Sequence, residues 1–177
     1  MKRLAIVGMP NTGKSTFFNR VTRTRNALVD DFPGVTRDRH YGDASWNGVE
    51  FTLVDTGGYL RANEDDFADL IRFQIEQAIE DADVIVLVLD GKAGISPFDA
   101  DLIKILREIS KPVFYAVNKI DSEKYEDLAV DFYSVGVDQV YPVSAMTGYG
   151  MGELLDALLE EIPPPDAPPE DVVFVTG

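Results

Sequence analysis

A lysine and a hydroxyl residue follow a glycine-rich turn near the start of the chain. The turn fits the pattern G-x-x-x-x-G-K-[ST] with the residues Gly8, Met9, Pro10, Asn11, Thr12, Gly13, Lys14 and Ser15, and Thr16 comes next. Such a turn lets successive backbone N–H groups surround phosphate oxygens, and the helix predicted after it adds a positive dipole end. Lys14 can bridge two phosphates of a nucleoside triphosphate, and Ser15 can ligate Mg²⁺. The stretch therefore predicts a phosphate-binding loop.

A second polar segment, "LVDTGG", follows an apolar run and contains Asp55, Thr56, Gly57 and Gly58. The Asp55 carboxylate can hold Mg²⁺ through water, and the Gly58 N–H can contact a γ-phosphate. Because D-x-x-G is common in sequences, this segment alone would be weak support for a nucleotide site.

Two further segments can recognise a base. "FYAVNKID" places Asn118, Lys119 and Asp121 at the end of another predicted strand. Asp121 can accept hydrogen bonds from guanine N1–H and the exocyclic amine, whereas adenine lacks both donors and would leave the carboxylate unpaired. We expect Asn118 to orient the loop and the Lys119 stem to cover the base. "YPVSAMTG" adds Ser144, Ala145 and Met146, where a backbone N–H can contact guanine O6.

Alternating strand and helix patterns must position these residues. Apolar or alternating runs predict strands over residues 3–7, 41–46, 50–54, 84–89, 112–117 and 139–143, with a hairpin turn at Asn47-Gly48. Helical spacing and caps predict helices over residues 15–24, 67–79, 96–110, 122–134 and 151–161. This order predicts an α/β P-loop fold of the Ras-like G-domain type. We expect a mostly parallel six-stranded sheet with one antiparallel edge strand and helices on both faces.

Composition narrows the class of protein. The chain has 177 residues, 45% hydrophobic content and no cysteine, so disulfides are excluded and a cytoplasmic location is expected. No apolar run approaches the length of a membrane span, and no signal peptide is visible. The net charge is −15, divided into +5 over residues 1–40 and −20 over residues 41–177. This acidic balance argues against direct nucleic-acid binding by this chain.

The finer spelling resembles a known family. "GMPNTGKSTFFNR", "DFPGVTRDR", "LVDTGG" and "VLDGKAGISPFDADLIKILR" are similar to the first Era-like G domain of the Der (EngA) family of GTPases. The resemblance covers residues 1–161, although Met9 and Thr12 stand where the family usually has arginine and valine. It implies GTP and GDP as ligands, Mg²⁺ as cofactor, and a whole protein with a second G domain and a KH-like domain. It also implies that the whole protein assists assembly of the large ribosomal subunit.

The proline-rich stretch 162–171 reads as a linker, and residues 172–177 resemble the start of a second G domain, so we expect a fragment. Between the first helix and the second strand, Thr36 is the candidate to contact Mg²⁺ and the γ-phosphate, as part of a first switch. Residues 57–66 would form the second switch. Arg37 and Arg39 read as exposed switch charges, and His40 as a surface loop histidine.

Catalysis is expected to involve Lys14, Thr36, Gly58 and Asn11. Tyr59 stands where Ras-like GTPases have the glutamine that positions water, so attack by water must be organised differently. Asn11 occupies the position that ligates K⁺ in those Era-like GTPases that use this ion, which makes it a candidate K⁺ ligand.

Two rival interpretations remain open. The isolated domain could be mainly a nucleotide-gated binding module with very slow turnover, which differs from an enzyme in its rate and in whether GTP and GDP change its affinity for another domain or the ribosome. A P-loop ATPase or nucleotide kinase is the other rival, and the Asn118–Asp121 segment argues against it.

Overall fold

The structure is a computed structural model that describes residues 2–22, 40–56 and 67–162. Six residues singled out in the sequence lie outside the described residues: Thr36, Arg37, Arg39, Gly57, Gly58 and Tyr59. The predicted first and second switches also fall mainly there, as do residues 163–177, so the linker and the second domain stay predictions.

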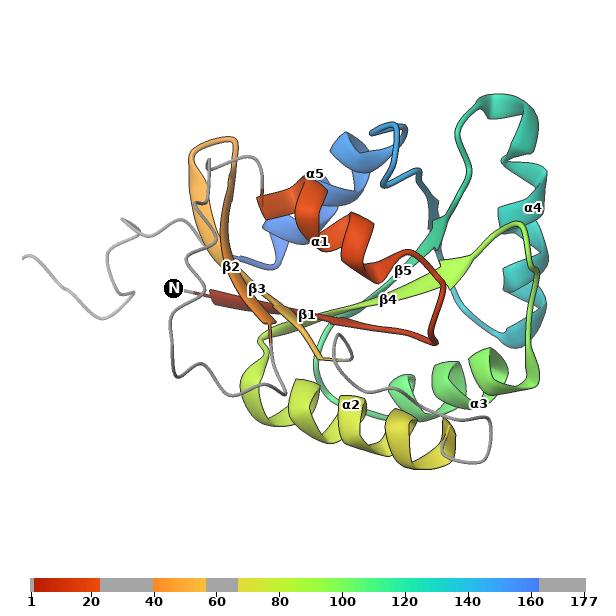
Figure 1. Cartoon of the computed structure of the whole chain (residues 1–177), viewed down its shortest axis with the longest axis horizontal. Coiled ribbons are helices and arrows are strands. Elements are labelled where there is room, and N and C mark those ends of the chain that lie inside the picture. Colours follow the sequence, from red (N-terminus) through yellow and green to blue (C-terminus); the bar gives the residue numbers. More distant parts are fainter. Residues whose placement is uncertain (1, 23–39, 57–66, 163–177) are drawn as a thin grey trace, which may run out of the picture.

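A six-stranded sheet forms the centre of the molecule (Figure 1), in the order β2-β3-β1-β4-β5-β6. Five strands are parallel: β1 (Lys2–Val7), β3 (Val49–Asp55), β4 (Val84–Asp90), β5 (Val113–Asn118) and β6 (Val140–Pro142). The edge strand β2 (His40–Trp46) runs antiparallel to β3, across a turn in which Asn47 has φ 50° and Gly48 has φ 82°. The predicted mixed sheet with one antiparallel edge strand and the predicted hairpin are confirmed.

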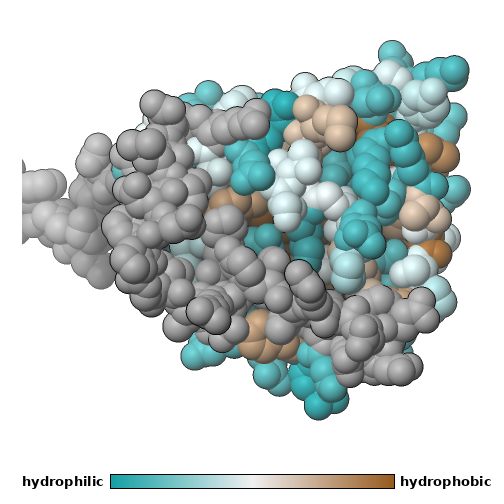
Figure 2. Space-filling view, in the orientation of Figure 1, coloured by the Kyte–Doolittle hydropathy of each residue, from teal (hydrophilic) through white to brown (hydrophobic). Residues whose placement is uncertain are grey.

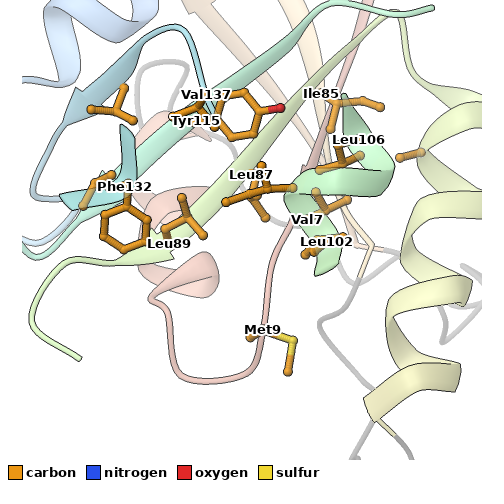
Figure 3. Close-up of a cluster of buried hydrophobic side chains, with 14 of the residues drawn as sticks. Val7, Met9, Ile85, Leu87, Leu89, Leu102, Leu106, Tyr115, Phe132 and Val137 are labelled. Carbon is orange, nitrogen blue, oxygen red and sulfur yellow. The ribbon is translucent and has the colours of Figure 1, made fainter. Parts of the chain in front are cut away.

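Helices cover both faces of the sheet (Figure 1) because the central strands are apolar on both sides. α1 (Lys14–Thr22) and α5 (Met151–Glu160) pack on one face, where Leu4, Val86 and Val88 belong to the same cluster. α2 (Phe67–Asp81) and α3 (Pro97–Leu106) pack on the other face. Figure 3 shows Val7, Leu87 and Leu102 in this second cluster.

Apart from the end of α3, which lies at Leu106 and not near residue 110, two predictions about the elements are wrong. Residues 122–134 do not form one helix, but the short turns η3 (Glu123–Tyr125), α4 (Asp127–Val130) and η4 (Asp131–Val135). Only Ala129 and Phe132 of these turns are buried, so too few apolar contacts stabilise a continuous helix. His40 is not in a loop, because it is the first residue of β2 and pairs with Asp55 of β3.

The beginning of α3 confirms the predicted cap. The Ser96 hydroxyl accepts a hydrogen bond from the Asp99 N–H at 3.0 Å, and the Asp99 carboxylate accepts one from the Ser96 N–H at 3.0 Å. Pro97 occupies the first helical position, where its missing N–H costs nothing.

On the face in Figure 2, hydrophobic residues are scattered among hydrophilic ones. None of the helices within the described ranges is both long and apolar enough to span a bilayer.

Candidate functional site

The parallel strands bring the predicted site segments to one edge of the sheet. β1 pairs with β3 and β4, and β5 pairs with β4 and β6, all in the same direction. The phosphate-loop segment follows β1, Asp55 ends β3, Asn118 ends β5, and Ser144 follows β6. Their carboxyl ends therefore meet at one edge, which is where ligands of such sheets bind.

The carbonyl groups of the phosphate loop, residues 8–15, are held by donors from the rest of the protein. Five carbonyls accept hydrogen bonds: Gly8 from Gln74 at 3.0 Å, Met9 from Thr12 at 3.0 Å, Asn11 from Lys119 at 2.9 Å, Thr12 from Asn118 at 2.9 Å, and Gly13 from the Phe17 N–H at 2.9 Å. The Gly8 N–H is bound by Gln74 as well, so the amide groups that the loop can offer to an anion are those that follow Gly8.

Lys14 is a buried cation at the start of α1, with 8% of its surface exposed. Burial lowers the pKa of its ammonium group, and the negative charge of Asp55 opposes that shift. Asp55 is itself buried at 2% exposure. A phosphate beside Lys14 would stabilise the buried ammonium, so the electrostatics favour an anionic ligand here.

Asn118 joins the phosphate loop to the base-reading loop. Its amide donates to the Thr12 carbonyl at 2.9 Å, and its carbonyl oxygen accepts from the Ala145 N–H at 2.9 Å. A side chain on Gly13 would collide with the Asn118 amide, which explains why a glycine stands there. Asn118 therefore orients both loops, as the sequence predicted for its own loop.

Lys119 is held between the base-reading loop and the phosphate loop. It adopts the left-handed conformation with φ 70°, and its Nζ donates to the Asn11 carbonyl at 2.9 Å and to the Asp90 carboxylate at 2.6 Å. The terminal ammonium group of Lys119 thus binds the phosphate loop. Asp121, two residues further, is exposed.

The segment after β6 is fixed from three sides. The Ser144 N–H donates to the Tyr149 carbonyl at 2.8 Å, and the Ala145 N–H is used by Asn118. Arg20 of α1 donates to the carbonyls of Ala145 and Met146, the second at 2.7 Å. Met146 is 79% exposed, so this turn presents its end to solvent at the candidate site.

Three predicted contact residues turn their side chains into the protein. Met9 packs in the hydrophobic cluster of α2 and α3 (Figure 3). The Thr12 hydroxyl donates to the Met9 carbonyl, and the Thr56 hydroxyl donates to the Ile6 carbonyl at 2.8 Å. Any contact of these three residues with a ligand therefore depends on their backbone. Met9 and Thr12 are also the two departures from the family pattern.

Ser15 and Asp55 could take part in a Mg²⁺ site. They supply a hydroxyl and a carboxylate oxygen, the hard ligands that Mg²⁺ prefers. Within the described ranges no group of three or more His, Asp or Glu side chains could hold a metal ion. A cation at Ser15 and Asp55 therefore needs further oxygens, and the phosphates of a nucleotide are their natural source.

Sequence reasoning missed three residues that hold the site together: Gln74, Arg20 and Asp90. Gln74 could have been noticed, because it is a polar residue within the apolar stripe of Ile71, Ile75 and Ala78. Arg20 and Asp90 carried no such signal, since a charged residue at the end of a helix or strand is ordinary.

Comparisons with known proteins agree with this geometry. A sequence model of the family described as "50S ribosome-binding GTPase" matches residues 3–119. The chain is 59% identical over 163 residues to GTPase Der of Desulforapulum autotrophicum, covering 92% of this chain and 33% of that protein. It is 49% identical over 167 residues to GTPase Der of Flavobacterium johnsoniae, covering 94% of this chain and 38% of that one. The chain thus spans about a third of the length of these curated relatives.

Solved structures share the fold. An Aquifex aeolicus Era variant bound to GDP and AlF4⁻ is 28% identical with a TM-score of 0.72, over 97% of this chain and 61% of that chain. The G domain of the T. maritima FeoB iron transporter is 28% identical with a TM-score of 0.63, over 91% of this chain and 98% of that chain. On its sequence match and its Era-like fold, the chain belongs to the 50S ribosome-binding GTPase family and, within it, to the Der GTPases.

Proposed function

We propose that the chain is a guanine-nucleotide-binding domain that hydrolyses GTP to GDP and phosphate. The observation that carries this proposal is the pair of hydrogen bonds by which Asn118 ties the phosphate loop to the Ser144–Met146 turn. One side chain thereby sets the distance between the phosphate site and the base site. The similarity to an Era structure bound to GDP and AlF4⁻ supports it.

The proposed roles follow from the donor groups. The amides of residues 11–16 and the Lys14 ammonium would bind the phosphates, and Ser15 and Asp55 would hold Mg²⁺. Mg²⁺, when bound, would neutralise charge on the β- and γ-phosphates. The Lys14 ammonium group would also neutralise phosphate charge, because in its buried position water screens its charge only weakly. The proposed ligands of the γ-phosphate also include Thr36, Gly57 and Gly58. Water would attack the γ-phosphate in line with the leaving GDP.

Base choice is the sharpest test of the proposal. Asp121 would accept two hydrogen bonds from guanine, and the backbone amide of Met146 would donate to O6. Asp121→Asn replaces one acceptor by a donor, which matches the carbonyl of xanthine. We expect a loss of GDP affinity of at least about tenfold and a gain for xanthosine diphosphate, measured by titration calorimetry.

The matched control is Asp127→Asn, another exposed aspartate at the beginning of α4. It removes the same charge from a residue to which the proposal assigns no ligand contact, and it should leave both affinities unchanged. Normal GDP binding by Asp121→Asn without any xanthine preference would refute the base assignment. ADP serves as competitor in the same titration, since the ATPase and kinase alternatives predict that it binds equally well.

K⁺ is proposed as a further ion beside the phosphates. Asn11 is exposed and adopts φ 69°. Lys119 donates to its backbone carbonyl, so the backbone that carries the Asn11 side-chain oxygen is held in place. GTP hydrolysis at fixed ionic strength should be faster in KCl than in NaCl, and Asn11→Ala should lose that advantage with little change in GDP affinity. Equal rates in the two salts for wild type would speak against a K⁺ site in this chain.

The wider role rests on the family. We propose that this domain belongs to a larger Der-type protein with a second G domain and a KH-like domain, and that the whole protein acts on the large ribosomal subunit. The alternative is that this domain gates binding with very slow turnover. Single-turnover GTP hydrolysis measures its rate directly. A rate no faster than hydrolysis in the Lys14→Ala variant would favour the gating role.

A further inference from the structure

Gln74 is a buried amide inside an otherwise apolar helix face. It lies on α2, is 1% exposed, and has Ile71, Ile75 and Ala78 as buried neighbours on the same side of the helix. Burying a primary amide in such a place costs free energy unless both its donor and its acceptor are satisfied. A leucine would fill this position at lower cost, so the amide calls for an explanation.

Both polar atoms of Gln74 bind one residue, the first glycine of the phosphate loop. The side-chain oxygen accepts from the Gly8 N–H at 2.9 Å, and the side-chain nitrogen donates to the Gly8 carbonyl at 3.0 Å. The Thr56 hydroxyl, at the end of β3, lies 3.5 Å from the same Gln74 oxygen. A primary amide offers a donor and an acceptor in this spacing, and among the other side chains only a protonated carboxyl group of the same length does so.

Gly8 is the point at which β1 ends and the phosphate loop begins. Its φ of 154° and its closeness to β4, where a Cβ would lie 2.6 Å from the Val88 carbonyl oxygen, leave its peptide groups little freedom. The orientation of this residue sets the direction in which the following loop leaves the strand. The other held carbonyls, of Met9, Asn11, Thr12 and Gly13, lie downstream of it.

We propose that Gln74 is a positioning residue for nucleotide binding, which sets the phosphate loop through Gly8 and ties it to α2 and the end of β3. The inference rests on the proposed function. Because the loop binds the phosphates common to GDP and GTP, loss of the Gln74 contacts weakens both nucleotides by a similar factor. Base choice, which depends on Asp121, is unaffected.

The first variant is Gln74→Met, which keeps the length and most of the volume but removes both hydrogen bonds. We expect GDP and GTP affinities to fall together by about tenfold, since the Gly8 groups lose their fixed partner. The preference for guanine over xanthine nucleotides should not change. Both affinities are measured by titration calorimetry, and folding by circular dichroism and thermal unfolding.

The matched control is Gln77→Met, on the same helix. The Gln77 side-chain oxygen is buried and has no hydrogen-bond partner among the described residues, and no contact of Gln77 with Gly8 is present there. This variant makes the same chemical change near the same core. It should alter the unfolding temperature without lowering nucleotide affinity.

A second variant separates positioning from simple destabilisation. In Gln74→Glu the ionised carboxylate can accept from the Gly8 N–H, but it faces the Gly8 carbonyl without a donor. Once protonated it regains an O–H donor, and burial raises the pKa of such a carboxyl. GDP affinity relative to wild type should therefore recover as the pH falls from 8 to 5.5. The affinity of Gln77→Met relative to wild type should not change over this pH range.

The measured affinities decide whether Gln74 positions the phosphate loop or only stabilises the fold. Wild-type affinity in Gln74→Met, or an equal loss in Gln74→Met and Gln77→Met, overturns the positioning role while leaving the proposed function intact. If Gln74→Met does not fold, the pH series of Gln74→Glu decides, and a relative affinity independent of pH overturns the role. Wild type that binds neither GDP nor GTP overturns the proposed function and this inference together.

Discussion

At the scale of single residues, Lys119 connects the base-reading loop to the phosphate loop. Its left-handed φ of 70° is unfavourable for a non-glycine residue, by an amount on the order of 1 kcal/mol. Such a conformation persists where the surroundings fix it, and here the Asn11 carbonyl and the Asp90 carboxylate do so. Backbone strain at Lys119 is therefore part of how the site is built.

Asp90 holds Lys119 and shapes the turn after β4. One carboxylate oxygen accepts from Lys119 at 2.6 Å, and the other accepts from the N–H groups of Lys92 and Ala93 at 2.9 and 3.0 Å. Burial by itself would raise the pKa of Asp90. The hydrogen bonds and the charge of Lys119 outweigh it and hold the pKa below the usual range. The ionised form is thus stabilised in the folded state.

We predict that Asp90→Asn loses about 1 kcal/mol of unfolding free energy at pH 7, because the amide keeps the turn but loses the ion pair. The estimate is small since Lys119 is 36% exposed and solvent screens the pair. The folded pKa is depressed, so wild type has this contribution above the ordinary aspartate pKa and loses it as pH falls through the folded value. Urea unfolding from pH 7 to pH 3 measures the difference.

The control for Asp90 is Asp83→Asn. Asp83 pairs with Lys2 at 3.8 Å, and both side chains are 45% exposed. Its substitution should change stability by less than about 0.5 kcal/mol at any pH, as exposed pairs do. A difference between wild type and Asp90→Asn that stays constant down to pH 3 would contradict the assigned ion pair.

At the scale of elements, the predicted strands and most helices are confirmed because their signals are local. The apolar run of β4, the turn residues Asn47-Gly48 and the cap at Ser96 each specify a structure without help from distant residues. The prediction of a single helix over residues 122–134 was wrong because the composition of the segment does not show how few of its residues pack on the sheet. The helix α3 ends at Leu106, whereas the sequence predicted an end near residue 110, and this boundary was wrong for the same reason.

The cap of α3 yields a direct prediction. Ser96→Ala removes the hydroxyl that accepts from the Asp99 N–H, and we expect a loss of about 1 kcal/mol in unfolding free energy. Ser122→Ala is the matched control, because Ser122 precedes η3 but makes no capping hydrogen bond through its side chain. Thermal unfolding of the two variants should show a clear drop for Ser96→Ala alone. Equal drops would mean that the cap contributes nothing specific.

At the scale of the whole molecule, sequence could predict which edge carries the site but not how it is fixed. Parallel strands bring their carboxyl ends together, so Lys14, Asp55, Asn118 and Ser144 were predictable as neighbours. The contacts that orient them join residues far apart along the chain, such as Asn118 with Thr12 and Gln74 with Gly8. No local pattern encodes such pairs, so the partners of Gln74, Arg20 and Asp90 emerged only in three dimensions.

The end of the domain is also a property of the whole fold. The sequence places the boundary after residue 161, yet Ile162 is 3% exposed and belongs to the cluster of α1 and α5. Its N–H donates to the Leu159 carbonyl at 3.1 Å, which continues the last turn of α5. Ile162 thus packs with the G domain, and the predicted linker is better tested from residue 163 onward.

We therefore predict that truncation after Ile162 leaves unfolding temperature and GDP affinity unchanged, whereas truncation after Glu161 costs about 2 kcal/mol, the value of one buried isoleucine side chain. Truncation after Glu161 also places a new terminal carboxylate next to α5, and this charge changes stability independently of the lost isoleucine. Ile162→Ala in the full chain avoids it and should be destabilised by at least about 2 kcal/mol. Urea unfolding of the three variants and wild type measures these differences. A loss after removal of residues 163–177 equal to that of Ile162→Ala would show that the tail packs on the domain and is not a linker.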